Sequence, residues 1–174
     1  MNWRELIMLE LKGTYAVTEK LISRAKDNEL GWKPSTGTNW MTTGQVLMHL
    51  TNACGTCFKG FVTGDWGMPE AKGSGDIPPE EMMPPAEKLP TVASVGEALL
   101  LLAEDRSLAF DMLAKCSDDD LASKMVAAPW NPNKMALGFQ LLMMVDHLKQ
   151  HKSQLFYYLK LQGQPVHTGD LWGM

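Results

Sequence analysis

The sequence contains few cysteines and no long hydrophobic run. Its three cysteines, Cys54, Cys57 and Cys116, are an odd number, which argues against a full disulfide framework. No stretch of about 18 apolar residues is present, so we expect no membrane-spanning helix. Charged side chains interrupt the first apolar stretch, MNWRELIMLELKG, and no small-residue cleavage site follows it. We therefore expect no signal peptide and a cytoplasmic protein.

An excess of positive charge is also absent. The formal net charge is −4, and the isoelectric point is about 5.5. No strong positive field exists to hold a phosphate backbone, so we expect no nucleic-acid partner. The 174 residues, of which 45% are hydrophobic and 21% charged, fit one globular domain over residues 1–174.

Alternating strand patterns are lacking too, whereas helical spacing of apolar residues is common. Such spacing predicts four long helices, at about residues 3–27, 43–62, 94–115 and 136–162. Asn2 and Glu5 have the spacing of a capping box at the start of the first helix, and Gly163 suits the end of the last. Four amphipathic helices of this length favour an all-α four-helix bundle.

The connections predicted between these helices differ in length and composition. Residues 63–92 are rich in glycine and proline, which predicts a long irregular connection between the second and third helices. Residues 117–120 suggest a short helical turn, residues 128–134 a broken stretch, and the tail from residue 164 an irregular segment. Within the third helix, the spacing leaves open whether Asp105 or Arg106 faces inward.

Three of the four histidines fall on predicted helices. His147 and His151 are four residues apart, so their rings share one helix face, one turn apart, where two imidazoles can bind one metal ion. Both border the apolar stripe of their helix. His49 borders the stripe of the second helix in the same way. The alternative to a metal site is that His147 and His151 are surface histidines and that His49 is hydrogen-bonded to a backbone carbonyl. Three border histidines on two helices together favour a shared metal site.

Segments around these histidines resemble a known family. VLMHLTNACG at 46–55, MMVDHLKQHKSQLFYYLKLQGQPV at 143–166 and PVHTGDLWG at 165–173 resemble the DinB/YfiT-like family of metalloproteins. The resemblance extends to the order of elements over nearly the whole chain. It implies a four-helix bundle of up-down-down-up topology, often a homodimer. It also implies one metal ligand from the second helix and two from the last, at positions that match His49, His147 and His151.

Three neutral imidazoles suit zinc, nickel, copper or iron. With the resemblance we expect zinc or nickel, and iron stays open. One branch of the family, the iron-binding domain of sulfoxide synthases, has a carboxylate where this chain has Ser153, which weakens an iron-oxygenase interpretation. Three protein ligands leave a coordination position open for water or substrate, as in catalytic sites.

The resemblance also includes enzymes that act on small thiols. It therefore implies a metal-dependent small-thiol transferase with a metal-bound thiolate as nucleophile, a small-molecule substrate and a low-molecular-weight thiol as partner. A hydrolase that uses bound hydroxide is the alternative reaction. A non-catalytic metal- or ligand-binding module is the third hypothesis.

Several other polar residues are candidates for supporting roles. Asn52 and Gln154 lie within about a turn of the ligands and could orient them, as could Gln45, Asp146 and Gln150; all could equally face solvent. Arg106, if it faces the cavity, could hold a substrate carboxylate; the alternative is an exposed charge or an ion pair.

The remaining candidates are cysteines, tryptophans and the fourth histidine. Cys54 and Cys57 form a C-x-x-C, but they lie on the apolar stripe of a helix, so we expect buried structural cysteines. Zinc binding by this pair with His49 is a poorer alternative, because Cys57 lies two turns from His49. We expect His167 at the surface. The loop tryptophans Trp66, Trp130 and Trp172 could roof a pocket or simply pack on the bundle.

Overall fold

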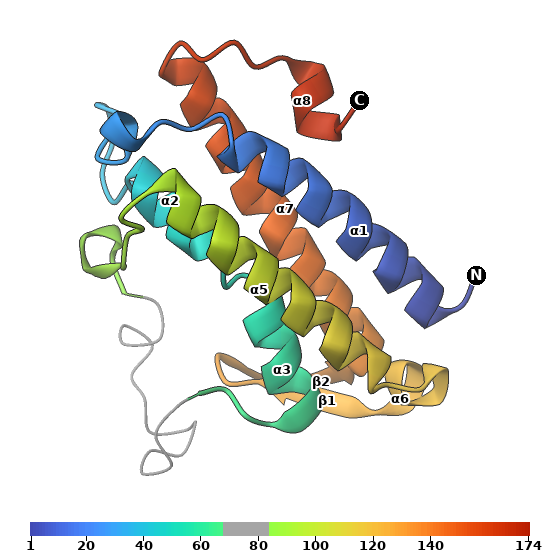
Figure 1. Ribbon diagram of the computed structural model, residues 1–174. Coiled ribbons are helices and arrows are strands. Elements are labelled where there is room, and N and C mark those ends of the chain that lie inside the picture. Colours follow the sequence, from blue (N-terminus) through green and yellow to red (C-terminus); the bar gives the residue numbers. More distant parts are fainter. Residues whose placement is uncertain (68–83) are drawn as a thin grey trace.

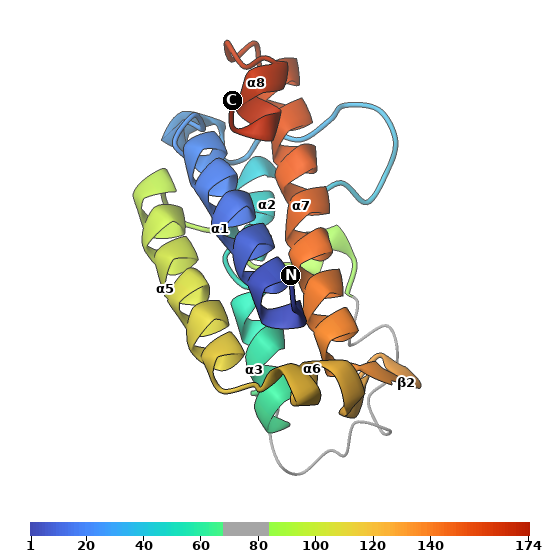
Figure 2. The ribbon, with the colours of Figure 1, turned by 90° about the vertical axis from the view of Figure 1, so that its right-hand side faces the viewer.

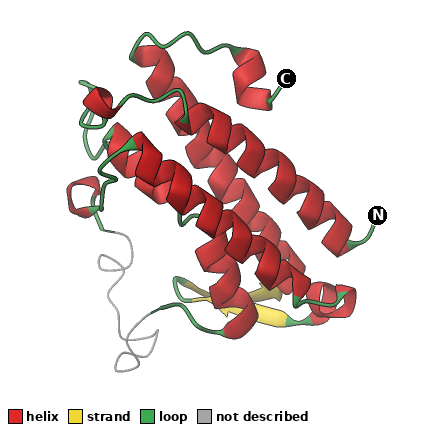
Figure 3. Ribbon diagram, viewed as in Figure 1, coloured by secondary structure: helices red, strands yellow, loops and turns green. Residues whose placement is uncertain are grey.

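The computed structural model describes residues 1–67 and 84–174, and it is mostly helical with one small two-stranded sheet (Figure 3). Its α-helices are α1 (Trp3–Ile22), α2 (Thr43–Leu50), α3 (Gly55–Thr63), α5 (Val95–Ala114), α6 (Asp118–Ser123), α7 (Leu137–Leu161) and α8 (Thr168–Trp172), and two short 3-10 helices are η1 (Asp27–Glu29) and η2 (Ala86–Lys88). Its strands are β1 (Met125–Ala128) and β2 (Asn131–Ala136). The predicted irregular connection at 63–92 lies largely outside the described residues.

The long helices pack side by side around one apolar core. Helix α1 packs against α5 and α7, and α3 packs against the same two helices, while α2 packs against α7. In Figure 1, α1 and α7 lead away from the end that holds α6 and the hairpin, and α2, α3 and α5 lead toward it. Figure 2 shows α1 between α5 and α7. None of the helices that the structure describes is long and apolar enough to cross a membrane.

Helix α1 begins where the sequence predicts and ends earlier. The Asn2 side chain accepts a hydrogen bond from the Glu5 N–H, and the Glu5 carboxylate accepts one from the Asn2 N–H, which confirms the capping box. The helix ends at Ile22 rather than near Asp27. The Asp27 carboxylate instead accepts a hydrogen bond from the Val95 N–H, so it satisfies a free donor in the first turn of α5.

The predicted helix at 43–62 is broken into two, α2 and α3, so the prediction of one continuous helix was wrong. The intervening residues 51–54 are not helical. The carboxylate of Asp105, on α5, accepts hydrogen bonds from the Gly55 N–H at 3.0 Å and the Thr56 N–H at 2.9 Å. A side chain distant in sequence thus replaces the carbonyl acceptors that a continuous helix would supply.

The expectation that the chain contains no strand was also wrong. Strands β1 and β2 form an antiparallel hairpin, in which Met125 pairs with Ala136 and Val126 with Met135. Pro132 and two asparagines give β2 no alternating pattern, and the register shifts between Val126 and Ala128. The hairpin contacts α3, α6 and α7, so tertiary packing rather than strand propensity accounts for it.

The other helix ends agree closely with the sequence. Helices α5 and α7 begin and end within one residue of the predicted bounds, and Gly163 has the positive φ of 76° expected at a helix end. Ser117 caps the short α6. The tail, predicted to be irregular, instead contains α8, whose Leu171 carbonyl accepts a hydrogen bond from the buried ammonium group of Lys152.

Candidate metal centre

The three predicted histidines come together where α2 and α7 pack against each other. His49 lies in the last turn of α2, and His147 and His151 lie one turn apart on α7. Their ring centroids are 4.2 Å apart for His49 and His151, 4.8 Å for His147 and His151, and 5.0 Å for His49 and His147. One ring nitrogen from each lies within 4.8 Å of the others, and all three side chains are half-buried.

The neighbours of His147 define its tautomer. Its Nδ1 lies 3.2 Å from the carbonyl oxygen of Ala53, in the break between α2 and α3. A carbonyl oxygen only accepts hydrogen bonds, so Nδ1 carries the proton and donates it. The Nε2 of His147 is then left with a free lone pair, and it lies 3.1 Å from the Nε2 of His49.

A chain of hydrogen bonds defines the tautomer of His151 in the same way. The chain begins at the Met41 carbonyl, which accepts from the Tyr158 hydroxyl at 3.0 Å. The Tyr158 oxygen then accepts from the Gln154 Nε2 at 3.2 Å, which leaves the Gln154 Oε1 facing the His151 Nδ1 at 2.9 Å. Because Oε1 is an acceptor, the His151 Nδ1 donates, and its Nε2 lone pair is free.

This arrangement fits a divalent metal ion. Two nitrogens that each lie about 2.05 Å from a tetrahedral ion are about 3.3 Å apart, close to the 3.1 Å between the His49 and His147 Nε2 atoms. Each Nδ1–H of His147 and His151 is held by an oxygen acceptor, as is usual for metal-binding histidines. At 3.1 Å the His49 Nε2 can share one proton with the His147 Nε2, and a divalent cation in place of that proton turns the same arrangement into three ligands.

The electrostatics keep the rings in the form that binds metal. Burial, together with the neighbouring His151 and His147, lowers the pKa of His49 to about 4. Burial likewise lowers the pKa of His151, which the hydrogen bond to Gln154 partly offsets. Both rings are therefore uncharged at neutral pH, and only an unprotonated imidazole nitrogen can coordinate a metal.

A cleft of about 480 Å³ adjoins His49 and His147. Its other lining residues come from the α2–α3 break, α3, the hairpin turn and α7, and they are Asn52, Cys57, Trp130, Met143, Met144 and Gln150. Sequence reasoning missed Met143 and Met144, although they precede His147 by four and three residues and so share its helix face. Trp130 is one of the tryptophans considered as a pocket roof.

Some of the predicted supporting residues lie at the candidate centre, and Gln45 does not. Gln154 contacts His151, and Asn52 and Gln150 line the cleft. The Gln150 amide also donates to the Asp146 carboxylate at 2.8 Å. Gln45 is instead buried against the segment that precedes α5, where it donates to the carbonyls of Ala86 and Leu89.

The structure settles which of the two charged residues on α5 faces inward. Asp105 is buried, with 4% of its surface exposed, and it also accepts a hydrogen bond from the Tyr15 hydroxyl. Arg106 pairs with Glu19 of α1 at 3.0 Å, and its side chain is 41% exposed. Arg106 is not among the residues that line the histidine cleft, so the structure does not bring it to the candidate centre.

The two cysteines of the C-x-x-C are free thiols, Cys54 buried and Cys57 half-buried at the cleft. Burial raises the pKa of the Cys57 thiol to about 12 and that of Cys54 well above its usual range, with the Asp105 carboxylate adding to both. Both thiols are therefore protonated at neutral pH. Among the described residues, the group that could hold a metal consists of the three histidines without either cysteine.

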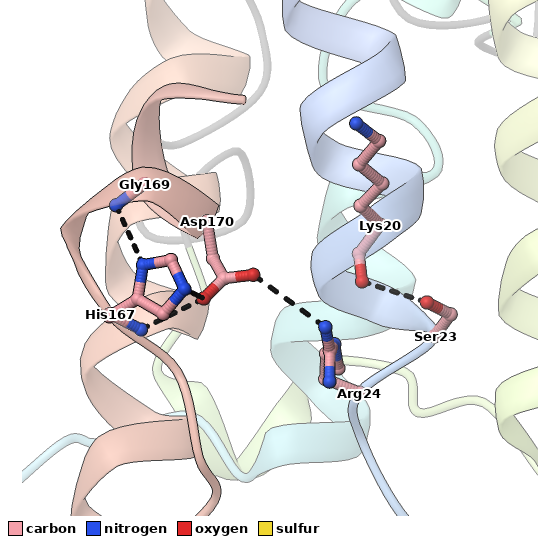
Figure 4. Close-up of polar contacts among 6 residues, drawn as sticks. All are labelled: Lys20, Ser23, Arg24, His167, Gly169 and Asp170. Atoms are coloured by element: carbon pink, nitrogen blue, oxygen red, sulfur yellow. Dashed lines mark hydrogen bonds and ion pairs between the residues drawn. The ribbon is translucent and has the colours of Figure 1, made fainter. Parts of the chain in front are cut away.

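The fourth histidine serves a different element. The His167 Nδ1 accepts a hydrogen bond from the Gly169 N–H at 3.0 Å, and the Asp170 carboxylate accepts one from the His167 N–H (Figure 4). Asp170 also pairs with Arg24 at 3.7 Å. These contacts cap α8 and tie it to the end of α1. His167 is exposed, as expected, and Trp172 at the end of the same helix is exposed too.

Comparisons with known proteins agree with this picture. A family model described as the DinB superfamily matches residues 10–155, a range that includes all three histidines. Among solved structures, the chain is similar to a DinB-like protein from Bacillus cereus, with 15% identity and a TM-score of 0.66 over 94% of this chain and 95% of that chain. At that identity the likeness concerns the fold alone. No curated protein matches the sequence.

Proposed function

Since the chain belongs to the DinB superfamily, we propose that it is a divalent-metal-binding protein whose ligands are His49, His147 and His151, and that it acts as a metal-dependent small-thiol transferase. The observation that carries the proposal is the convergence of the three rings beside a cleft, with Nε2 free on both α7 histidines. Zinc or nickel suits three neutral imidazoles best, and iron is the third option.

Each part of the site has a role in this proposal. A divalent ion lowers the pKa of a coordinated thiol and so supplies a thiolate at neutral pH. The Ala53 carbonyl and Gln154 orient the rings of His147 and His151. The apolar walls of the cleft would contact the substrate, and Asn52 and Gln150 offer amide groups that can hydrogen-bond to it.

The finer features of the fold belong to the same proposal. We propose that the helices form the family's up-down-down-up four-helix bundle, as one domain over residues 1–174, and that the chain forms a homodimer. The opposite directions of the pair α1 and α7 and the set α2, α3 and α5 support the topology (Figure 1). The likeness to the Bacillus cereus protein over nearly all of both chains supports the single domain.

A thiol-transfer assay tests the proposed reaction. Protein loaded with zinc or nickel is incubated with a panel of small thiols and a chromogenic aryl halide, and thioether formation is followed by absorbance. We expect product that needs both thiol and metal, that is lost in His151→Ala and that persists in His167→Ala, the matched control outside the centre. Product that forms without thiol would favour the hydrolase alternative. Bound metal without any turnover would favour the binding module.

A further inference from the structure

We infer that the cleft beside His49 and His147 takes the uncharged, largely apolar body of a small-molecule ligand whose donor atom reaches the histidines. This inference rests on the proposed function, because the ligand's donor atom is taken to bind the metal. It adds the class of substrate: an aromatic or alkyl molecule without a charged group in the cleft. Three features of the cleft carry it: the polarity of its lining, the carboxylates that act on that lining, and the aromatic and methionine side chains of its walls.

The lining is apolar apart from the histidines and two amides. Trp130, Met143, Met144 and Cys57 supply most of the wall, and Asn52 and Gln150 supply the neutral polar groups. No described residue that lines the cleft carries a charge. A charged group that leaves water for this surface would lose its hydration without gaining an ionic partner, apart from the metal itself.

Two carboxylates act on residues of the lining. The carboxylate of Asp105 acts on the Cys57 thiol and, together with burial, raises the pKa of that thiol. The carboxylate of Asp146 accepts a hydrogen bond from the Gln150 amide. A second anion placed among these groups, away from the metal, would meet repulsion in addition to its desolvation cost. The cleft therefore disfavours a carboxylate on the body of the ligand.

The walls of the cleft suit an aromatic or alkyl body. Trp130 is held by the edge-to-face contact of its ring with Trp66 at 5.4 Å and with Phe61 at 6.3 Å, so one wall is a supported aromatic surface. Met143 and Met144 face the same space from α7 with flexible, polarizable side chains that adapt to varied apolar ligands. A volume of about 480 Å³ lies within the usual range for small-molecule sites.

A pair of ligands that differ only in charge tests this inference. The probes are 4-(mercaptomethyl)benzoate and its methyl ester, in which the rigid ring keeps the carboxyl group too far from the sulfur to bind the same ion. Titration calorimetry on zinc-loaded protein gives both dissociation constants. We expect the ester to bind at least about tenfold more tightly than the acid. Equal affinities, or a preference for the acid, would overturn the inference.

Two lysine variants show whether the cleft itself sets the preference. Met143 is 42% exposed, so Met143→Lys can place an ammonium group at the cleft without disturbing the core. It should improve binding of the acid and reduce the preference for the ester by about tenfold. Leu9→Lys adds the same charge at an exposed position on α1 outside the cleft, and it should leave the preference unchanged. Equal shifts in both variants would contradict a local effect.

Failure of the proposed function can be told apart from failure of this inference. The zinc content of the loaded protein is measured first by elemental analysis. If no zinc is retained, the proposed function fails, and the cleft is then tested with the sulfur-free pair 4-methylbenzoate and its methyl ester. A preference for the ester in that pair upholds the apolar cleft on its own, and equal binding or none refutes it.

Discussion

At the scale of single residues, the proposed metal binding by His147 and His151 depends on the partners of their Nδ1 atoms. The sequence predicted the pair from its spacing and identified Gln154, which lies three residues after His151 on the same helix face. The partner of His147 could not be predicted, because it is the backbone carbonyl of Ala53, which the helix break leaves available. The Met41 carbonyl is likewise brought in by the tertiary fold, 117 positions before Tyr158.

The hydrogen-bond chain behind His151 leads to a prediction for metal affinity. Gln154→Leu removes the acceptor for the His151 Nδ1–H, so the ring can rotate or change tautomer, and zinc affinity should fall by about 10–100-fold. Tyr158→Phe leaves Gln154 in place without its anchor and should cause a smaller loss in the same direction. Competition titration with a zinc chelator measures both. Gln164→Leu, which removes a glutamine that is hydrogen-bonded to Glu29, is the control. A wild-type zinc affinity in Gln154→Leu would contradict a role for this hydrogen-bond chain in orienting His151.

The position of Arg106 leads to a second prediction at this scale. Arg106 and Glu19 form a partly exposed ion pair between α5 and α1, away from the cleft lining. Arg106→Ala should therefore lower the free energy of unfolding by less than about 1 kcal/mol and leave KM for any thiol substrate unchanged. Urea denaturation and steady-state kinetics give the two quantities. A large rise in KM would restore the expectation that Arg106 holds a substrate carboxylate.

At the scale of elements, the break between α2 and α3 connects the core to the candidate metal centre. The Asp105 carboxylate accepts hydrogen bonds from the first N–H groups of α3 and from the Tyr15 hydroxyl at 2.7 Å. The chain turns there, and the Ala53 carbonyl points to His147. Helical periodicity continues through residues 51–54, so the sequence alone predicts no break. The cause is a buried carboxylate 50 positions later.

The close contact of α3 with α5 predicts the effect of adding one methyl group. A Cβ at Gly55 would collide with the carbonyl oxygen of Asp105 and lie 2.8 Å from its Oδ1, neither of which can move far. Gly55→Ala should therefore destabilise the protein by about 3 kcal/mol. Gly13→Ala, in α1, meets nothing within 4 Å and should stabilise by up to about 1 kcal/mol. Thermal and urea denaturation compare the two, and a neutral Gly55→Ala would contradict the described contact.

The hairpin shows where local sequence signals fail at this scale. Its strands are short, and β2 carries a proline, so neither the period nor the composition indicates pairing. Phe61 lies in α3 and Trp66 follows it, and the rings of both contact Trp130 in the hairpin turn. The loop tryptophans were recognised as candidate roof residues, but only the packing shows that Trp130 lines the cleft while Trp172 lies on α8.

At the scale of the whole molecule, the histidines join two helices that are distant in sequence. His49 on α2 and His147 on α7 are 98 positions apart in the sequence, and they meet where these two helices pack against each other. One metal ion can bind all three residues only in the folded state. Its binding free energy therefore adds to the stability of the fold.

This coupling predicts a metal-dependent melting temperature. An ion present at 100 times its dissociation constant adds about 2.7 kcal/mol to the folded state. For a domain of this size, that gain raises the Tm by about 5–10 °C. Differential scanning calorimetry with and without zinc measures the shift, which His147→Ala should abolish and His167→Ala should preserve. An equal shift in both variants would indicate metal binding elsewhere.

The proposed function requires that His49, His147 and His151 bind one divalent ion. The most direct measurement is the metal content of the purified chain after metal-replete preparation, by inductively coupled plasma mass spectrometry on wild type and the three single alanine variants. We expect close to one ion per chain in wild type and far less in each variant, with every variant still folded by circular dichroism. A wild-type chain that retains no near-stoichiometric metal, or alanine variants that retain as much as wild type, would contradict it.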